Sequence, residues 1–301
     1  GSEMCIRDRT NEGAVRYLIK EKETPDCILA LCSETVRKKA VVEMPDGSTC
    51  TTLEYFRDAL RRVGIPAERL VVIEVPDSMD DEKKQFQAIS QLLDKIEKED
   101  TLSIDLSGGM RDTAMLLVTA ARCMRDLRGV QTRRVIYAEL RGEEPVAHDR
   151  TQLYDLFDFV TAMDEFFSTG TAQKLKSYLW SEGEKDPVLH TLLTRINQFS
   201  DDLALCRVRK LNDDLNQIAQ ALKETPKKGQ NLTDLFFRLL KDRFSTEFAE
   251  LLSSGEKALP ALVSWCAKHG MYQQALTLLC EQMPEYVCQH LFVQPTERGW
   301  D

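Results

Sequence analysis

Short apolar runs alternate with amphipathic stretches along the first half of the chain. A run of roughly four to eight residues rich in valine, isoleucine and leucine is typical of a strand buried on both faces of a parallel sheet. The runs of this kind are residues 27–32, 70–75, 101–106 and 133–140, and a short edge strand is expected at residues 146–148. The stretches with apolar side chains at helical spacing are residues 12–22, 52–63, 80–98 and 110–127. This alternation predicts an α/β domain over residues 1–149, a Rossmann-like parallel sheet with helices on both faces and right-handed crossovers.

From residue 151 the pattern changes to helices alone. Leucine and aromatic side chains recur at helical spacing, and Gly170 ends the first of these helices. Further helical segments are expected at residues 188–197, 201–223, 231–252, 259–269 and 272–282. No period of roughly 20 to 50 residues repeats convincingly, so a solenoid is not predicted. The sequence therefore predicts a second, all-α domain over residues 150–301 with a core of leucines and aromatic residues.

The composition is ordinary for a soluble globular protein of two domains. The chain has 301 residues, of which 43% are hydrophobic and 30% charged, and this balance excludes disorder. No apolar run approaches the roughly 20 residues of a membrane helix, and no secretory signal is present, so we expect a cytoplasmic protein with no membrane contact. The net charge of −9 argues against direct DNA binding, which usually shows as a basic surface. The binding of a small anion in one local pocket remains compatible with this net charge.

Neither the cysteines nor the histidines are spaced like metal ligands. The nine cysteines form no C-x-x-C pair, so we expect reduced core thiols rather than disulfides. Those that lie inside apolar patterns include Cys27, Cys32, Cys123 and Cys280. The four histidines form no cluster with them. The sequence thus implies no metal and no cofactor.

The two ends differ from the rest of the chain. Residues 1–9 fit neither a strand nor a helix start and resemble a translated adapter or cloning scar, so no fold element is expected there. On this interpretation the native protein begins upstream and its first element is missing. Residues 292–301 stop without a clear structural reason, which indicates a second truncation.

The stretch over residues 101–117 carries the strongest sign of chemistry. After a short buried strand, residues 107–109 (Ser-Gly-Gly) turn the chain, and a helix follows from Met110. This order points several backbone N–H groups and a helix N-terminus at an anion, and the glycines let the backbone approach a ligand closely. Arg111 lies in the first helical turn, where the helix dipole disfavours a cation, so a role in gripping phosphate is indicated. The alternative is that the glycines only form a tight turn and that Arg111 is a solvated surface charge.

A second candidate group follows the strand at residues 27–32. Ser33 and Glu34 come directly after this strand, and the carboxyl ends of parallel strands are where open α/β sheets bind ligands. The alternative is that these residues only cap a helix, the role expected of Asn11 and Asp77 elsewhere in this domain.

Other known motifs match parts of the sequence less well. The segment from Leu106 to Arg111 resembles the signature loop of ABC ATPases, but the G-x-x-x-x-G-K-[ST] phosphate loop that this requires is absent. Residues 107–113 also resemble the SGGxDS loop of ATP pyrophosphatases with one residue too many, which stays a minor alternative. The Arg-x4–6-His motif of HEPN nucleases is matched only by chance, at Arg141 and His148. The helical domain carries no recognisable catalytic set.

The order of these elements resembles CRISPR-associated CARF proteins. The features that carry the resemblance are the strand and helix around DLSGGMRDTAMLL, the strand that ends in Tyr137-Ala138-Glu139, and the helical segment LVSWCAKHGMYQQALTLLCEQ. More narrowly, the chain is similar to the subgroup with a C-terminal helical extension, in which a loop of the form D-[IL]-[TS]-[HG]-G-[FM]-R follows the fourth strand. The resemblance covers residues 12–282 and is best at residues 104–113 and 265–281.

The resemblance implies a sensor of cyclic oligoadenylates, the second messengers made by type III CRISPR complexes in antiviral defence. CARF domains of this kind act as two-fold homodimers that bind one ring across the dimer face, at the carboxyl ends of the strands. A two-fold pair of glycine turns and helix N-termini suits such a symmetric ring of phosphodiesters. The effector domain to which the sensor relays is expected outside this chain. The candidate ligand-binding residues are Ser107, Gly108, Gly109, Met110, Arg111, Thr113, Ser33, Glu34 and Glu139.

Two features depart from the family pattern. Gly108 stands where many relatives have histidine, so any role of that histidine is absent. The family's first strand and its ligand loop are expected to be lost with the missing N-terminus, and no catalytic residue is assigned. The enzyme-class alternative is a ring nuclease, in which the pocket itself cleaves the ring by holding a ribose 2′-hydroxyl in line with its phosphate.

Overall fold

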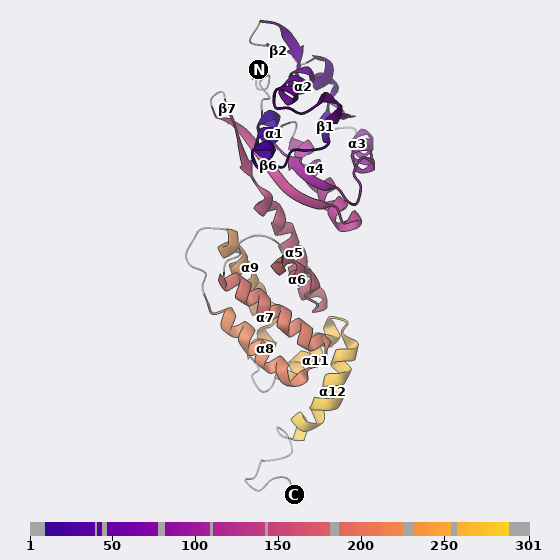
Figure 1. The fold of residues 1–301 in the computed structure, drawn as a ribbon. Helices are drawn as coiled ribbons and strands as arrows, with labels where there is room; N and C mark the ends of the chain where they lie inside the picture. Colours follow the sequence, from indigo (N-terminus) through magenta and orange to yellow (C-terminus); the bar gives the residue numbers. More distant parts are fainter. Residues whose placement is uncertain are drawn as a thin grey trace. The chain divides into compact units, whose positions relative to one another are not determined.

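A computed structural model shows the chain as two compact units, Gly1–Tyr154 and Asp155–Asp301, each of which is described by itself (Figure 1). The structure describes residues 10–39, 41–43, 47–77, 82–108, 111–141, 144–180, 187–224, 232–253 and 258–288. Within these ranges the protein is of the mixed α/β class, and its strands lie in the first unit.

The first unit alternates strands with helices, as the sequence predicts. Its strands are β1 (Ile28–Cys32), β2 (Val41–Glu43), β3 (Thr49–Thr51), β4 (Leu70–Glu74), β5 (Thr101–Asp105), β6 (Gln131–Arg141) and β7 (Glu144–Asp149). Its helices are α1 (Thr10–Lys20), α2 (Thr52–Arg62), α3 (Glu82–Asp94) and α4 (Arg111–Cys123), and its shorter helical turns are η1 (Thr35–Lys39), η2 (Ala67–Arg69) and η3 (Met124–Arg128). The predicted strands are confirmed to within a few residues, whereas β2 and β3 were not predicted.

The strands divide into separate small sheets. β1 pairs in parallel with β4, with Ile28 opposite Leu70 and Cys32 opposite Glu74. β5 pairs in parallel with β6, which pairs in turn with the antiparallel β7, and β2 and β3 form an antiparallel hairpin. Among the described residues no ladder of hydrogen bonds joins β1 to β5. The single Rossmann-like sheet expected from the sequence is therefore not confirmed.

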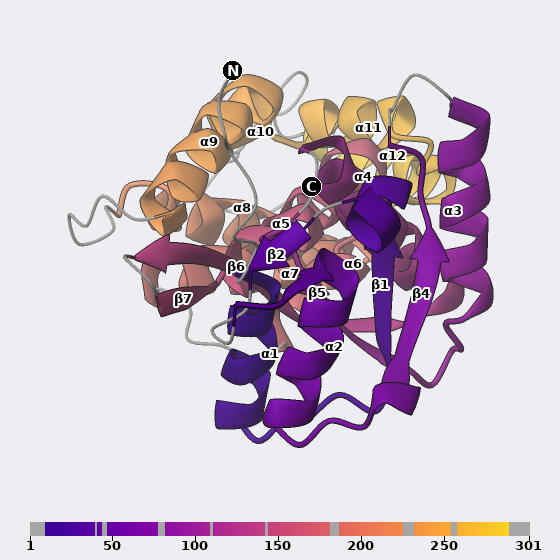
Figure 2. The ribbon, with the colours of Figure 1, turned by 90° about the horizontal axis from the view of Figure 1, so that it is seen from above.

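Helices nevertheless cover both faces of these strands. On one face α1 and α2 lie side by side (Figure 2) and bury Val15 and Leu60 against the first residues of β1 and β4. On the other face α3 and α4 bury Leu92 and Ala120 against β1, β4 and β5. Alternate residues of a strand thus meet different helices, as the pleat of a strand between two helical layers requires.

The strands predicted to be buried are only partly buried. The first four residues of β1 are of intermediate exposure, and only Cys32 is buried. In β5 only Ile104 is buried. The reason is that each of these strands has a neighbour on one side only among the described residues, so its other edge stays open.

The expectation that the cysteines are core thiols is wrong for several of them. Cys32 and Cys266 are buried, but Cys27, Cys123 and Cys280 are exposed. Cys27 lies just before β1 and Cys123 is the last residue of α4, so both stand at the ends of elements rather than in their buried stretches.

The second unit is built from helices in all the parts that the structure describes. α5 (Thr151–Thr169) leads into it, and its further helices are α6 (Gln173–Trp180), α7 (Pro187–Ala204), α8 (Val208–Ala221), α9 (Leu232–Glu247), α10 (Ala249–Ser253), α11 (Ala258–Lys268) and α12 (Tyr272–Val287). Gly170 ends α5 with a φ of +71°, and a Cβ there would lie 2.9 Å from the ring of Trp265. The predicted helix end at this glycine is confirmed, and close packing explains it.

Aromatic rings form the centre of this helical unit. Phe166, Phe199, Phe244 and Phe248 are fully buried. The rings of Phe166 and Phe248 stack with their centroids 5.7 Å apart, and Trp265 packs on Phe248 at 5.2 Å. The prediction of an aromatic and leucine core is confirmed.

A buried pair of carboxyl groups lies on α7 and α8. Asp202 is fully buried and accepts hydrogen bonds from Gln198 Nε2 and Arg207 Nη1, each at 2.9 Å. Burial opposes the ionisation of Asp202, but these hydrogen bonds outweigh burial and lower its pKa. Asp214 is 5% exposed, and burial together with the charge of Asp202 raises its pKa from 3.8 to about 6.

The raised pKa of Asp214 predicts a loss of stability with rising pH. Because the folded chain binds this proton more tightly than the unfolded chain, the contribution of Asp214 to the free energy of unfolding falls as the pH rises from 3.8 through about 6. Asp214→Asn cannot ionise, so its stability relative to the unsubstituted protein should increase across that range. Denaturant unfolding at several pH values measures the difference. Asp213→Asn, at an exposed position on the same helix, is the control, and a pH-independent difference for Asp214→Asn contradicts the assignment.

Candidate functional site

Hydrogen bonds from two sides fix the turn that follows β5. Asp105, the last residue of β5, accepts hydrogen bonds from the Ser107 hydroxyl and, at 2.9 Å, from the Ser107 backbone N–H. Its second carboxylate oxygen accepts a hydrogen bond of 2.8 Å from the Asn11 side chain on α1. The N–H of Leu106 donates to the Ile136 carbonyl on β6 at 2.9 Å. The turn is therefore held by both α1 and β6.

The Ser107 hydroxyl also accepts a hydrogen bond, from the backbone N–H of Ala138 on β6 at 2.6 Å. A serine has one N–H and one O–H to donate, and Ser107 gives both to Asp105. Neither is left for a phosphate oxygen. The structure thus gives Ser107 a role in positioning the loop, and a contact between Ser107 and a ligand stays a prediction.

Gly108 is required because α1 approaches it closely. A Cβ added at this position would lie 2.5 Å from Oδ1 and 2.9 Å from Nδ2 of Asn11, the side chain that is hydrogen-bonded to Asp105. Both separations are shorter than a van der Waals contact, so any larger residue must displace Asn11. Packing against α1 is thus a reason for glycine at position 108 in addition to the turn.

The rest of this loop is described only in part. Gly109 and Met110 lie outside the described residues, and so does the side chain of Arg111. The backbone of Arg111 begins α4, one residue after the predicted start, and α4 is 13 residues long. Its first turn therefore presents backbone N–H groups without intrahelical partners at the end of the loop. Thr113, in that turn, is 8% exposed, which indicates that its side chain packs inside the protein.

The end of β1 repeats the pairing of a serine with an aspartate. Ser33 donates its hydroxyl hydrogen to Asp77, and the Thr35 N–H donates to the same carboxylate at 2.9 Å. The hydrogen bond from Ser33, followed by that from Thr35, lowers the pKa of Asp77. Glu34 is exposed, with a carboxylate oxygen 3.7 Å from Lys38 Nζ. Ser33 thus holds a turn in place, as Ser107 does.

Glu139 lies on β6 beside the turn, because its neighbour Ala138 is hydrogen-bonded to Ser107. Its carboxylate accepts a hydrogen bond from Arg141 Nε at 2.9 Å and lies 3.3 Å from His148 Nε2 on β7. The hydrogen bond from Arg141, followed by that from His148, lowers the pKa of Glu139. This carboxylate is therefore ionised at neutral pH and paired with a cation.

The structure brings only part of the predicted set together. Ser107, Gly108 and Glu139 gather where the turn meets β6. Ser33 and Glu34 lie in the other parallel pair, at the end of β1. No hydrogen bond or ion pair between described residues joins Ser33 or Glu34 to Ser107 or Gly108.

Asn11 belongs to this site although the sequence suggested only a helix cap. α1 begins at Thr10, so Asn11 lies inside the first turn, and its side chain reaches a residue 94 positions away in the sequence. No local pattern reveals such a contact. The role of Asp105 could have been predicted from the local sequence. An aspartate two residues before a serine is typical of a turn in which the aspartate side chain accepts a hydrogen bond from a backbone N–H.

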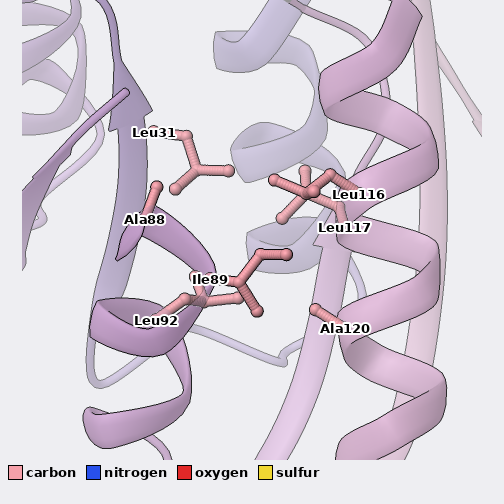
Figure 3. A pocket seen from close by; sticks show the side chains of 7 residues that line it. All are labelled: Leu31, Ala88, Ile89, Leu92, Leu116, Leu117 and Ala120. Carbon is pink, nitrogen blue, oxygen red and sulfur yellow. The ribbon is translucent and has the colours of Figure 1, made fainter. Parts of the chain in front are cut away.

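A small apolar gap lies between β1, α3 and α4, and it suits no anion. The side chains that line it are Leu31, Ala88, Ile89, Leu92, Leu116, Leu117 and Ala120 (Figure 3). All of them are aliphatic, so the gap offers a phosphate no side-chain hydrogen-bond donor.

The chain matches no model of a known protein family, and no curated protein matches it. In the part of the chain that the structure describes, no helix is long and apolar enough to cross a bilayer. Within the same ranges, no group of three or more histidine, cysteine, aspartate or glutamate side chains is placed to hold a metal ion.

The contact between Gly108 and Asn11 predicts a coupled effect on stability. Gly108→Ala should displace Asn11 and break its hydrogen bond to the charged Asp105, which costs about 1.5–3 kcal/mol. In an Asn11→Ala background the obstacle is gone, and Gly108→Ala should cost less than about 0.5 kcal/mol. Denaturant unfolding of the two single variants, the double variant and the unsubstituted protein gives the coupling. Additive effects of the two substitutions contradict the close approach.

Proposed function

We propose that this protein is a receptor for cyclic oligoadenylates, with two copies binding one ring across a two-fold axis. The observation that carries the proposal is the turn between β5 and α4, which α1 and β6 fix and which leads into a helix N-terminus. Such a turn is preorganised for an anion, because the first N–H groups of a helix have no partner within it. Its sequence, Ser-Gly-Gly-Met-Arg, is also the part that most resembles the CARF ligand loop.

The donors to the phosphodiesters come from the backbone and from Arg111. Both donors of Ser107 are bound to Asp105, and Thr113 is buried. The helix dipole disfavours a cation at position 111, which supports a role for this arginine outside the helix. A guanidinium forms two parallel hydrogen bonds with one phosphate, so Arg111 is the principal side-chain contact in this proposal.

The carboxylates around the candidate site are compatible with an anionic ligand. Asp105 and Asp77 each accept hydrogen bonds from a serine and from a second donor. Glu139 is paired with Arg141 at 2.9 Å. The negative charge of these groups is therefore directed at donors within the protein itself, which weakens its repulsion of a phosphate.

The helical unit has a relay role in this proposal rather than a chemical one. The aromatic rings of its core, among them Phe166 and Phe248, are buried, so these rings are not free to stack on a nucleobase. A conformational change caused by ring binding in the first unit would be transmitted through α5 to an effector. Cleavage of the ring by the same pocket is the enzyme alternative, and it would show as a linear product in the binding experiment below.

The symmetry of the ligand predicts a homodimer. A ring with two-fold symmetry is met best by a two-fold receptor, with both copies of the loop near the axis. Light scattering at tens of micromolar protein should give twice the mass of one chain, at least with the tetra-adenylate ring present. A monomeric mass with and without the tetra- and hexa-adenylate rings contradicts this assembly.

The role of Arg111 predicts a large loss of affinity on substitution. Each subunit loses a charged hydrogen-bonded contact worth about 1.5–3 kcal/mol, so Arg111→Ala should weaken binding of the ring at least about a hundredfold. Arg111→Lys should recover only part of the affinity, because an ammonium cannot make the bidentate contact. Calorimetric titration with the tetra- and hexa-adenylate rings measures this.

Arg122→Ala is a matched control for this experiment. Arg122 lies on the same helix and is ion-paired with Asp126 at 2.9 Å, so its loss should leave ring binding unchanged. Thermal unfolding should show that all three variants remain folded. Unchanged affinity in Arg111→Ala would remove Arg111 from the site, and a lack of binding by the unsubstituted protein would overturn the proposed function.

A further inference from the structure

α12 exposes apolar side chains on one side and buries them on another. It packs beside α11 (Figure 1) and buries Ala275 and Leu278 in the core of the helical unit. Tyr272, Leu276 and Leu279 lie outside this core and are 67%, 60% and 43% exposed. We call these three residues the α12 stripe. The described residues of the chain thus cover only one of the two apolar faces of α12.

The spacing of the α12 stripe is that of a contact line between two helices. Its members are separated by four and then by three residues. Apolar side chains at such alternating intervals form the line along which two helices pack in a coiled coil. Met283, four residues beyond Leu279, continues the spacing and is partly buried. Single exposed leucines are common in soluble proteins, but an ordered apolar line on a helix indicates that a second helix covers it.

The charged residues near the α12 stripe lie at its two ends. Lys268 is the last residue of α11 and precedes the stripe, and Glu281 follows its end. Both side chains are exposed, and within the described part of the chain neither has an ion-pair partner. Residues 272–280 between them carry no charged side chain. The surface is thus an uncharged, largely apolar strip with a cation at one end and an anion at the other.

Two copies of such a strip are complementary when they lie antiparallel. A two-fold axis near Leu276 places the end of one α12 beside the start of the other. Glu281 of each copy then lies next to Lys268 of the other copy, so the symmetry makes two attractive contacts. A parallel pair would place Glu281 beside Glu281 and Lys268 beside Lys268, and these like charges repel.

We propose that the α12 stripe binds a second copy of this chain, with the two α12 helices antiparallel and Glu281 of each copy beside Lys268 of the other. A second copy fits better than an unrelated helix, because the two charges of one chain already complement each other under a two-fold rotation. The stripe has only three large apolar side chains, so the interface lies at the small end of specific contacts and its Kd should be micromolar. This contact lies in the helical unit and does not depend on the proposed ligand.

The first test measures the monomer–dimer equilibrium of the full chain by sedimentation equilibrium, without nucleotide, between about 1 and 200 µM. Leu276→Asp places two like charges near the axis, away from water, so the Kd of the dimer should rise at least about a hundredfold. The matched control is Leu239→Asp on α9, where the leucine is 52% exposed and lies outside the α12 stripe. It should leave the Kd unchanged, and circular dichroism should show that both variants remain folded.

Arg111→Ala separates this contact from the assembly proposed for ring binding. Arg111 belongs to the first unit, so its substitution should leave the Kd of the nucleotide-free dimer unchanged. A nucleotide-free dimer that Arg111→Ala abolishes overturns the present proposal and leaves the proposed ring receptor intact.

The second test addresses the antiparallel orientation. Lys268→Glu and Glu281→Lys each place like charges together twice, so each should raise the Kd about fivefold or more. The variant with both substitutions restores opposite charges and should dimerise with a Kd within about twofold of that of the unsubstituted chain.

Three outcomes overturn the proposal. The first is an unsubstituted chain that stays monomeric throughout the concentration range. The second is a Kd that Leu276→Asp leaves unchanged. The third is a double charge variant that dimerises no better than the two single variants, because a parallel pair or a nonspecific apolar contact gives no recovery.

Discussion

The carboxylate of Asp105 is the interaction on which the candidate site depends. It stands at the end of β5 and accepts hydrogen bonds from Asn11 of α1 and from Ser107, whose hydroxyl accepts from the Ala138 N–H of β6. One side chain thus ties together three elements that are far apart in the sequence. Hydrogen bonds to an ionised acceptor are stronger than those between neutral groups, so Ser107, at the start of the loop, is held firmly in place. Because Asn11 is held there, a residue at position 108 with a Cβ would have to displace it, which favours Gly108.

In this arrangement the residues that position the turn differ from those that can bind a ligand. Ser107 and Ser33, which sequence alone suggests as ligand contacts, both give their hydroxyl hydrogen to an aspartate. A site that must receive a polyanion gains little from flexible hydroxyl groups and more from donors held in advance. The backbone N–H groups at the start of α4 meet that requirement, since the helix itself determines their direction.

Local features could be predicted from the sequence, and contacts between distant segments could not. The strand at residues 70–75, the helix at residues 52–63 and the end of α5 at Gly170 agree with the structure, because periodicity and turn residues report the local backbone. The contact of Asn11 with Asp105 spans 94 positions, so a residue suited to a cap gave no sign of it. The division of the strands also escaped prediction. An apolar run indicates that a strand needs neighbours on both sides but not whether both are present.

The candidate residues are divided between two separate pairs of parallel strands, β1 with β4 and β5 with β6. β1 and β5 each end in a turn held by a serine and an aspartate, yet the two turns belong to separate pairs of strands. Among the described residues no ladder of hydrogen bonds joins the two pairs, so the distance between those turns depends on the helices α3 and α4, which pack against both. Ordering two segments on binding reduces affinity, whereas packing that holds both segments beforehand avoids this cost. The stability of this domain and the affinity of a site that contacts both turns therefore depend on the same apolar packing, in which Leu92 of α3 and Ala120 of α4 are buried against both pairs of strands.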